Sequence, residues 1–228
     1  VDSYNLRGFS FREYLNLMAS THFPSYSLSD IITNHRAIAQ EICAQVNPLD
    51  YFPGYLHHGY YPFFLDKSNF SENLVKNINM IMEVDILAPT NVSQLSKDIQ
   101  ISRATVMNYI KSLKDARLIN MLYRVGEEFP KKPAMVYMHN TNIIYSNRSV
   151  QADPQSIRET FFYNTLHKDH RLNMGSKNAQ FLVNRELLFR IQGSVPRSRI
   201  NPHFYYAVDD LKIGSENLIP LWLFGFVY

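Results

Sequence analysis

The sequence predicts a mixed α and β fold with a winged helix-turn-helix near its middle. Apolar residues recur at helical spacing through the first part of the chain. Residues 89–123 contain a short helix, a tight turn and a second helix, followed by an extended run. After Gly175 the pattern changes to short apolar runs that are typical of strands. Helices followed by a run of strands indicate a small α/β or α+β domain at the end of the chain.

The composition is that of a globular protein. The chain has 228 residues, of which 46% are hydrophobic and 19% charged, so it can bury a core and is not a disordered tail. This length suits one large domain or two to three small ones. The net charge of +3 is mild, so it permits an anionic partner but does not demand one.

Cysteine content and apolar runs give the expected location. Cys43 is the single cysteine, which excludes an internal disulfide and fits a reducing cytoplasm. We expect it to be a buried structural thiol. The longest apolar run, residues 219–228, is too short to span a bilayer, so no membrane partner is expected. The chain begins at Val1 without an initiator methionine, and we expect it to be processed or part of a longer protein.

The first segment is predicted to be helical. Ser10 and Glu13 fit a capping box, which predicts a helix over residues 11–19. A polar loop follows, and a second helix is expected over residues 35–46. Pro48 then precedes, and Pro53 and Pro62 interrupt, an aromatic-rich stretch, residues 49–65, which we expect to form loops and short helices packed by their rings.

The winged module is predicted from caps and periodicity. Ser71 caps a helix that runs to about residue 86, and a short helix follows over residues 92–98. Ser102 is a good N-cap for the next helix. Its buried face is given by apolar residues at i, i+4 and i+7, namely Val106, Ile110 and Leu113. Extended runs at residues 118–124 and 135–138 then predict a strand, a wing and a second strand.

The outer face of this second helix carries the candidate DNA contacts. Its side chains can meet phosphates or base edges, and a basic wing follows. The candidates are Arg103, Thr105, Asn108 and Lys111 on the helix and Lys131 and Lys132 on the wing. Winged helices also serve as protein-docking modules, and a surface helix often carries a few such charges. Double-stranded DNA and a protein partner therefore both stay open.

The end of the chain is predicted as one helix and several strands. Residues 140–153 are expected to be a connector. Ser156 and Glu159 fit a second capping box, which opens a helix to about residue 167. The predicted strands cover residues 180–183, 187–191, 203–208 and 221–227.

Other sites are weaker candidates. The sequence contains no Gly-x-x-x-x-Gly-Lys-[Ser/Thr], so this chain alone is not expected to hold ATP by a P-loop. His57 and His58 are adjacent, and we expect them to point apart in a ring-packed loop instead of sharing a metal ion. Asp209 and Asp210 end a predicted strand, where a turn role is favoured over a metal site.

Four segments together resemble one family. They are YNLRGFSFREYLNL at residues 4–17, GYYPFFL at 59–65, IRETFFYNTL at 157–166 and IPLWLFGFVY at 219–228. Their order and spacing resemble the AAA-type ATP-binding proteins of bacteria and archaea that carry a winged helix and a restriction-endonuclease-like tail. The resemblance covers essentially the whole chain.

The resemblance implies a domain organisation and a set of partners. It implies the end and lid of an ATPase domain at residues 1–66, a winged helix at 67–139 and a small α/β nuclease-like domain at 140–228. ATP and Mg²⁺ would be held by sequence upstream of Val1, with no cofactor in this chain. Arg7 matches an arginine after the ATPase core strand, where it would lie near nucleotide or a neighbouring subunit, or form a structural ion pair. The upstream ATPase domain and a homo-oligomer are the implied protein partners.

The tail departs from the pattern of an active nuclease. Such an enzyme uses an acid on the first helix, an Asp ending a strand and a Glu-x-Lys on the next strand to hold a metal ion that activates water. Glu159 matches the helix acid, but Asn184 matches the Asp, and Arg190 and Gln192 match the Glu-x-Lys. Because an amide and a guanidinium are poor ligands for a hard cation, we expect this domain not to cut DNA.

These observations lead to one main function and two alternatives. The chain is expected to be the DNA-binding and regulatory portion of an AAA-type ATP-binding protein, without ATP hydrolysis of its own. The first alternative is a docking or oligomerisation module that does not bind DNA. The second alternative, an active nuclease, is disfavoured by the missing acids.

Overall fold

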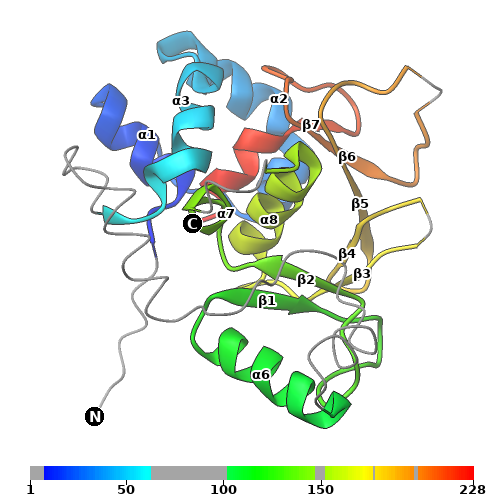
Figure 1. The fold of residues 1–228 in the computed structure, drawn as a ribbon. Coiled ribbons are helices and arrows are strands. Elements are labelled where there is room, and N and C mark those ends of the chain that lie inside the picture. The colour runs from blue at the N-terminus through cyan, green and yellow to red at the C-terminus, as the bar shows by residue number, and fades with distance from the viewer. Residues whose placement is uncertain (1–7, 63–101, 147–151, 177, 198–199) are drawn as a thin grey trace.

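A computed structural model describes residues 8–62, 102–146, 152–176, 178–197 and 200–228 (Figure 1). Its helices are α1 (Phe11–Ala19), α2 (Leu28–Gln45), α3 (Pro48–Gly54), a π-helix (Tyr55–Gly59), α6 (Arg103–Asp115), α7 (Thr141–Ser146), α8 (Pro154–Leu166) and a 3₁₀ helix (Leu221–Phe226). Its strands are β1 (Ile119–Leu122), β2 (Met135–Met138), β3 (Leu172–Met174), β4 (Phe181–Val183), β5 (Leu187–Gln192), β6 (Tyr205–Val208) and β7 (Leu218–Pro220). The helices predicted over residues 71–86 and 92–98 lie outside the described residues.

The first two helices begin with capping boxes. Ser10 and Glu13 form the predicted box, and α1 has the predicted bounds. The second helix begins seven residues earlier than predicted, at Leu28, and replaces part of the expected loop. Ser27 and Asp30 cap each other's backbone N–H groups there, at 3.0 and 3.1 Å. A short aspartate can close such a box as glutamate does, and this signal was missed in the sequence.

The segment before the tail helix also differs from the prediction. Asp153, and not Ser156, is the N-cap of α8, because its Oδ2 accepts from the Ser156 N–H at 2.8 Å and Pro154 occupies the first turn. The expected connector over residues 140–153 contains the short helix α7. The aromatic-rich stretch forms α3 and the π-helix, as the prediction of short helices required.

A five-stranded mixed sheet forms the tail. Its order is β3-β4-β5-β6-β7, antiparallel from β3 to β5 and parallel from β5 to β7. Helix α8 covers one face through Phe162, whose ring lies 5.2 Å from that of Phe181 and 5.0 Å from that of Phe189. β3 was not predicted.

The predicted strand over residues 221–227 is wrong. β7 ends at Pro220, and the chain continues as the 3₁₀ helix, whose six residues are all buried. A run that is apolar on every side has no periodicity, so its pattern does not distinguish a buried strand from a buried helix.

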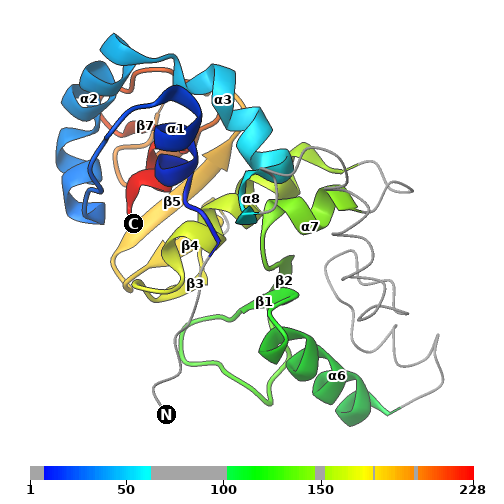
Figure 2. The same ribbon diagram turned by 90° about the vertical axis from the view of Figure 1, so that its left-hand side faces the viewer.

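The helices before residue 62 share a hydrophobic core with the tail. The Phe11 ring lies 6.1 Å from Phe226 and 6.5 Å from Trp222, and the Phe52 ring lies 4.9 Å from Phe161. All five of these side chains are buried in one cluster. Figure 2 shows α1, α2 and α3 gathered beside the sheet, at the end of the molecule away from α6.

The winged part lies at the opposite end. β1 and β2 form an antiparallel hairpin, with α6 on one side and α8 on the other (Figure 1). The hairpin is joined to the tail sheet, because the Met174 N–H donates to Tyr123 O at 2.8 Å and the Asn173 side chain reaches the same carbonyl at 3.3 Å. No helix among the described residues is long and apolar enough to cross a membrane.

Buried polar groups fix the junction between these parts. The Asn142 side chain is fully buried, donates to Tyr55 O and Leu56 O, and accepts from the Tyr60 N–H at 2.9 Å. The His139 carbonyl accepts from Asn164 Nδ2 at 2.7 Å. Since a buried polar group is costly to leave unpaired, these bonds specify how the π-helix, α7 and α8 meet.

His139 at this junction predicts an acid-dependent loss of stability. Burial, and to a smaller extent the charges of His167 and Arg117, lower the pKa of His139 to about 4. An unfolded chain takes up this proton near pH 6.5, so between pH 6.5 and 4 it binds more protons than the folded chain. The free energy of unfolding is therefore expected to fall by about 3 kcal/mol across this window because of His139.

Urea unfolding at several pH values measures this effect. His139→Gln is expected to flatten the slope between pH 6.5 and 4. His203→Gln, at an exposed position, is the matched control and should leave the slope unchanged. Equal slopes for wild type and His139→Gln would show that His139 does not titrate differently on folding.

Candidate nucleic-acid interface

Helix α6 is the second helix of the predicted bihelical unit. Ser102 is its N-cap, and the Ser102 Oγ accepts from the Thr105 N–H at 3.1 Å. The buried face carries Val106 and Ile110, as the spacing predicted, together with Met107, which was not predicted. The predicted Leu113 is only partly buried and packs against this cluster. These side chains pack against Leu118, Ile119 and Met121. The core of the winged part therefore fixes which face of α6 points outward.

Three of the four predicted contact residues on α6 are exposed. Arg103, Asn108 and Lys111 are exposed, while Thr105 is half-buried. The Thr105 hydroxyl lies 2.8 Å from Ser102 Oγ, so it takes part in the cap. Lys111 Nζ lies 2.8 Å from Asp115 Oδ2, and this bond lowers the pKa of Asp115. Such an exposed pair is weak, so an incoming phosphate can compete for Lys111.

Tyr109 is a feature that sequence reasoning missed. Its side chain is 57% exposed although it is large and aromatic. Its position three residues after Val106 and one before Ile110 suggests the buried side, but the helix turns it to the edge of the outer face. Tyr109 does not belong to the i, i+4 and i+7 set of Val106, Ile110 and Leu113, and this signal could have shown that it is exposed.

The wing is the loop between β1 and β2. Lys131 and Lys132 are both exposed there. Arg124 lies 3.9 Å from Glu127 at the start of the loop, in a long ion pair whose arginine is exposed and whose glutamate is half-buried. Residues 102–134 carry seven lysines and arginines and three acids, although the net charge of the whole chain is only +3. The mild charge is thus concentrated on α6 and the wing, at one end of the molecule (Figure 2).

The comparisons with known proteins agree with this module. Residues 78–121 match the family described as "Bacterial regulatory protein, arsR family". The chain contains an ArsR-type helix-turn-helix domain. This match confirms the helix-turn-helix prediction. A domain of this type implies DNA binding. The match includes α6 and most of β1 but does not extend to the segments that resemble an ATPase or a nuclease. No curated protein and no solved structure matches this chain.

The four predicted nuclease positions are not brought together. β4 and β5 are antiparallel, so Asn184, after the end of β4, lies beside the start of β5, whereas Gln192 lies at its far end. Asn184 Oδ1 accepts from the Arg171 N–H at 3.0 Å, and its amide lies 3.1 Å from His170 Nδ1. Asn184 and Gln192 are therefore separated along the length of β5.

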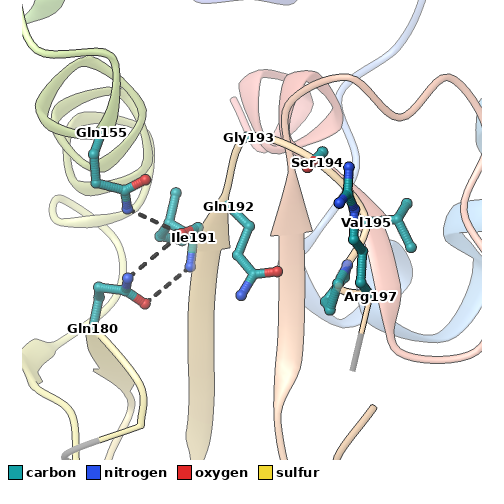
Figure 3. A pocket seen from close by; sticks show the side chains of 9 residues that line it. Gln155, Gln180, Ile191, Gln192, Gly193, Ser194, Val195 and Arg197 are labelled. Carbon is teal, nitrogen blue, oxygen red and sulfur yellow. Dashed lines mark hydrogen bonds between the residues drawn. The ribbon is translucent and has the colours of Figure 1, made fainter. Parts of the chain in front are cut away.

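Gln180, and not Asn184, lies with Gln192 in the lining of a notch. This notch of about 500 Å³ is lined by Gln155, Gln180, Ile191, Gln192, Gly193, Ser194, Val195, Pro196 and Arg197. Figure 3 shows that Gln155 and Gln180 converge on the main chain of Ile191. Gln180 Oε1 accepts from the Ile191 N–H at 3.0 Å and its Nε2 donates to Ile191 O at 3.4 Å. The Gln180 carboxamide thus extends the hydrogen bonding between β4 and β5 by one step, just before the first residue of β4.

Arg190 and Glu159 have other contacts. The Arg190 guanidinium lies over the Tyr206 ring, 5.6 Å from its centroid. Glu159 accepts from Gln155 Nε2 and from the Tyr137 hydroxyl, each at 2.8 Å. Neither residue lines the notch. The notch is therefore bordered by amides, one hydroxyl and one guanidinium, with no carboxylate among its lining residues.

The remaining candidates have structural partners. Asp209 and Asp210 lie in a turn after β6, as predicted, and Asp209 forms a 2.7 Å ion pair with Arg158. Cys43 is half-buried, with Sγ 3.7 Å from Lys212 O, and burial raises the pKa of its thiol. Arg7 lies outside the described residues.

The expectation that His57 and His58 point apart is wrong. Both residues lie in the π-helix, and their Nδ1 atoms are 3.4 Å apart. His57 packs on the Tyr145 ring at 4.7 Å. Across the described part of the chain, no three His, Cys, Asp or Glu side chains are grouped closely enough to hold a metal ion.

Proposed function

We propose that this chain binds double-stranded DNA through the outer face of α6 and the wing. Arg103, Asn108 and Lys111 meet the duplex from the helix, and Lys131 and Lys132 meet the backbone beside it. The observation that carries the proposal is the concentration of exposed cations on an ArsR-type helix-turn-helix. Thr105 holds the first turn of α6 through its cap. DNA binding would place the chain in the cytoplasm.

The finer organisation is part of the same proposal. Residues 1–66 are the end and lid of an AAA-type ATPase domain, 67–139 the winged helix and 140–228 a nuclease-like domain that does not cut. ATP and Mg²⁺ act in the upstream ATPase domain, and Arg7, which lies outside the described residues, is the candidate for a contact near that nucleotide or for a structural ion pair. The support is the ordered resemblance of four segments to this family, together with a tail whose sheet ends in a notch bordered by glutamines. The chain regulates or positions the ATPase on DNA, and a homo-oligomer follows if that ATPase forms a ring.

A salt titration of duplex binding tests the DNA proposal. Neutralising about four phosphates with Arg103, Lys111, Lys131 and Lys132 gives a slope of about −4 for log K against log salt. The affinity is then expected to fall roughly a hundredfold between about 50 and 200 mM salt. Fluorescence anisotropy of a labelled duplex measures it. A weak and flat response would instead support the docking alternative, in which α6 and its exposed Tyr109 meet a protein.

A further inference from the structure

Helix α8 holds the wing hairpin by side-chain hydrogen bonds. The Tyr137 hydroxyl, from β2, donates to Glu159 Oε2 at 2.8 Å. The Tyr163 hydroxyl donates to Met121 O of β1 at 3.1 Å. Asn164 Nδ2 donates to His139 O, just after β2, at 2.7 Å. Both strands of the hairpin are therefore tied to one helix of the tail.

The hydrogen bond from Tyr137 to Glu159 is buried, and its donor keeps its proton. The Tyr137 side chain is buried, and its ring lies 5.7 Å from that of Tyr163 and 5.8 Å from that of Phe181. Burial, with the charge and hydrogen bond of Glu159, raises the pKa of Tyr137 far above its ordinary value, so the hydroxyl stays protonated and donates. A hydrogen bond to a carboxylate is stronger than one between neutral groups, particularly when it is shielded from water.

Both carboxylate oxygens of Glu159 are engaged. The second oxygen, Oε1, accepts from Gln155 Nε2 at 2.8 Å, and the same amide donates to Ile191 O at 2.9 Å. A chain of hydrogen bonds thus runs from the end of β5 through Gln155 and Glu159 to β2. The acid that matches a metal ligand of nucleases is used here to bind β2, the strand that follows the wing.

We infer that Glu159 is a positioning residue for DNA binding, which holds the wing on the tail through Tyr137. This inference rests on the proposed function, because it concerns how Lys131 and Lys132 are presented to the duplex. Lys131 and Lys132 lie on the loop that leads directly into β2. A hairpin fixed at β2 holds these cations in one orientation. A loosened hairpin loses conformational entropy when DNA orders it, and this loss lowers the affinity.

Conservative and non-conservative variants of Glu159 separate this role from metal binding. Glu159→Gln keeps an oxygen that can accept from Tyr137 and gives up only the acceptor for Gln155 Nε2, whereas Glu159→Ala leaves the hydroxyl without a partner. Positioning therefore predicts that Glu159→Gln stays within about twofold of wild type in duplex affinity, while Glu159→Ala binds roughly fivefold more weakly. A metal ligand would lose its function in both variants, because an amide is a poor ligand for a hard cation.

Tyr137→Phe provides the second arm of the test. It is expected to match Glu159→Ala, and the double variant should be no worse than either single one, because both remove the same bond. Glu41→Ala, at an exposed position of α2, is the matched control. Duplex affinity is measured by anisotropy with and without Mg²⁺, and hydrogen exchange of residues 119–138 is measured in the free protein. Exchange there should be about tenfold faster in Glu159→Ala and near wild type in Glu159→Gln.

The two readouts keep the inference separate from the DNA proposal. Weak, salt-independent binding by wild type removes the DNA proposal, while faster exchange in Glu159→Ala still supports anchoring of the wing. Normal DNA binding with unchanged exchange in Glu159→Ala and Tyr137→Phe would overturn the inference. Equal losses in Glu159→Gln and Glu159→Ala, seen only with Mg²⁺, would also overturn it and would favour a metal ligand.

Discussion

Reversing Lys131 and Lys132 to glutamate is expected to weaken duplex binding about a hundredfold at about 0.1 M salt. Each reversal removes one phosphate contact and the counterion release that accompanies it, and it adds a repelled carboxylate in the same place. Both lysines are exposed on the wing, so their replacement leaves the buried core intact. The salt slope should also become shallower by about 2, since two phosphates are no longer neutralised.

The control for this double variant lies at the other end of the molecule. Arg36 and Lys212 are exposed, on α2 and in the loop beside Cys43, so Arg36→Glu with Lys212→Glu changes the net charge by the same amount. A long-range effect of net charge would weaken both double variants equally. A local interface would weaken only the wing variant. If the wing variant binds like wild type while its unfolding is unchanged, α6 and the wing are not the contact surface.

Phe161→Ala is expected to lower the free energy of unfolding by about 4 kcal/mol. The side chain is 2% exposed, and its ring packs edge-on against Phe52 at 4.9 Å and near Tyr55 at 6.1 Å. Truncation therefore leaves a cavity between the tail helix α8 and the helices of the first segment, which cannot close without moving both. For a chain of this size the melting temperature should fall by about 10 °C.

The shape of the transition tests how the segments are joined. Because one core contains side chains from residues 8–62 and 152–228, we expect these segments to unfold together in wild type and variant. Calorimetry measures the number of transitions, and limited proteolysis shows whether the first segment is released alone. Tyr109→Ala, at an exposed position, is the control and should change stability by no more than about 0.5 kcal/mol. Two separate transitions, with only one shifted, would show that the first segment is an independent domain.

Local signals in the sequence were sufficient for α6 and its surroundings. The Ser102 cap and the i, i+4 spacing of apolar residues predicted the helix and its buried face. The bounds of β2 were also predicted, because it is a short apolar run after a basic, proline-containing loop. These features depend on neighbours within a few residues, so the chain carries their information locally.

The nuclease-like positions needed more than local signals. Asn184 was chosen by its place at the end of a strand, but the antiparallel pairing of β4 with β5 sets the other end of β4, at Phe181, opposite Phe189, nearer to Gln192. Gln180 and Gln155 meet at Ile191 although they are 25 residues apart in sequence, one just before β4 and one on α8. Strand register and the packing of α8 on the sheet decide such tertiary contacts, and sequence motifs show neither of them.

The sequence by itself determined the helix-turn-helix, the place of its exposed cations and the absence of a P-loop. Caps, period and residue chemistry carry these features, and the family match at residues 78–121 supports the first of them. The tertiary structure alone decided that the wing is tied to the tail through Glu159 and Tyr137, and that the first helices pack on the same core. These contacts join residues far apart in the chain, and they form only when packing of large buried rings sets the distance between elements.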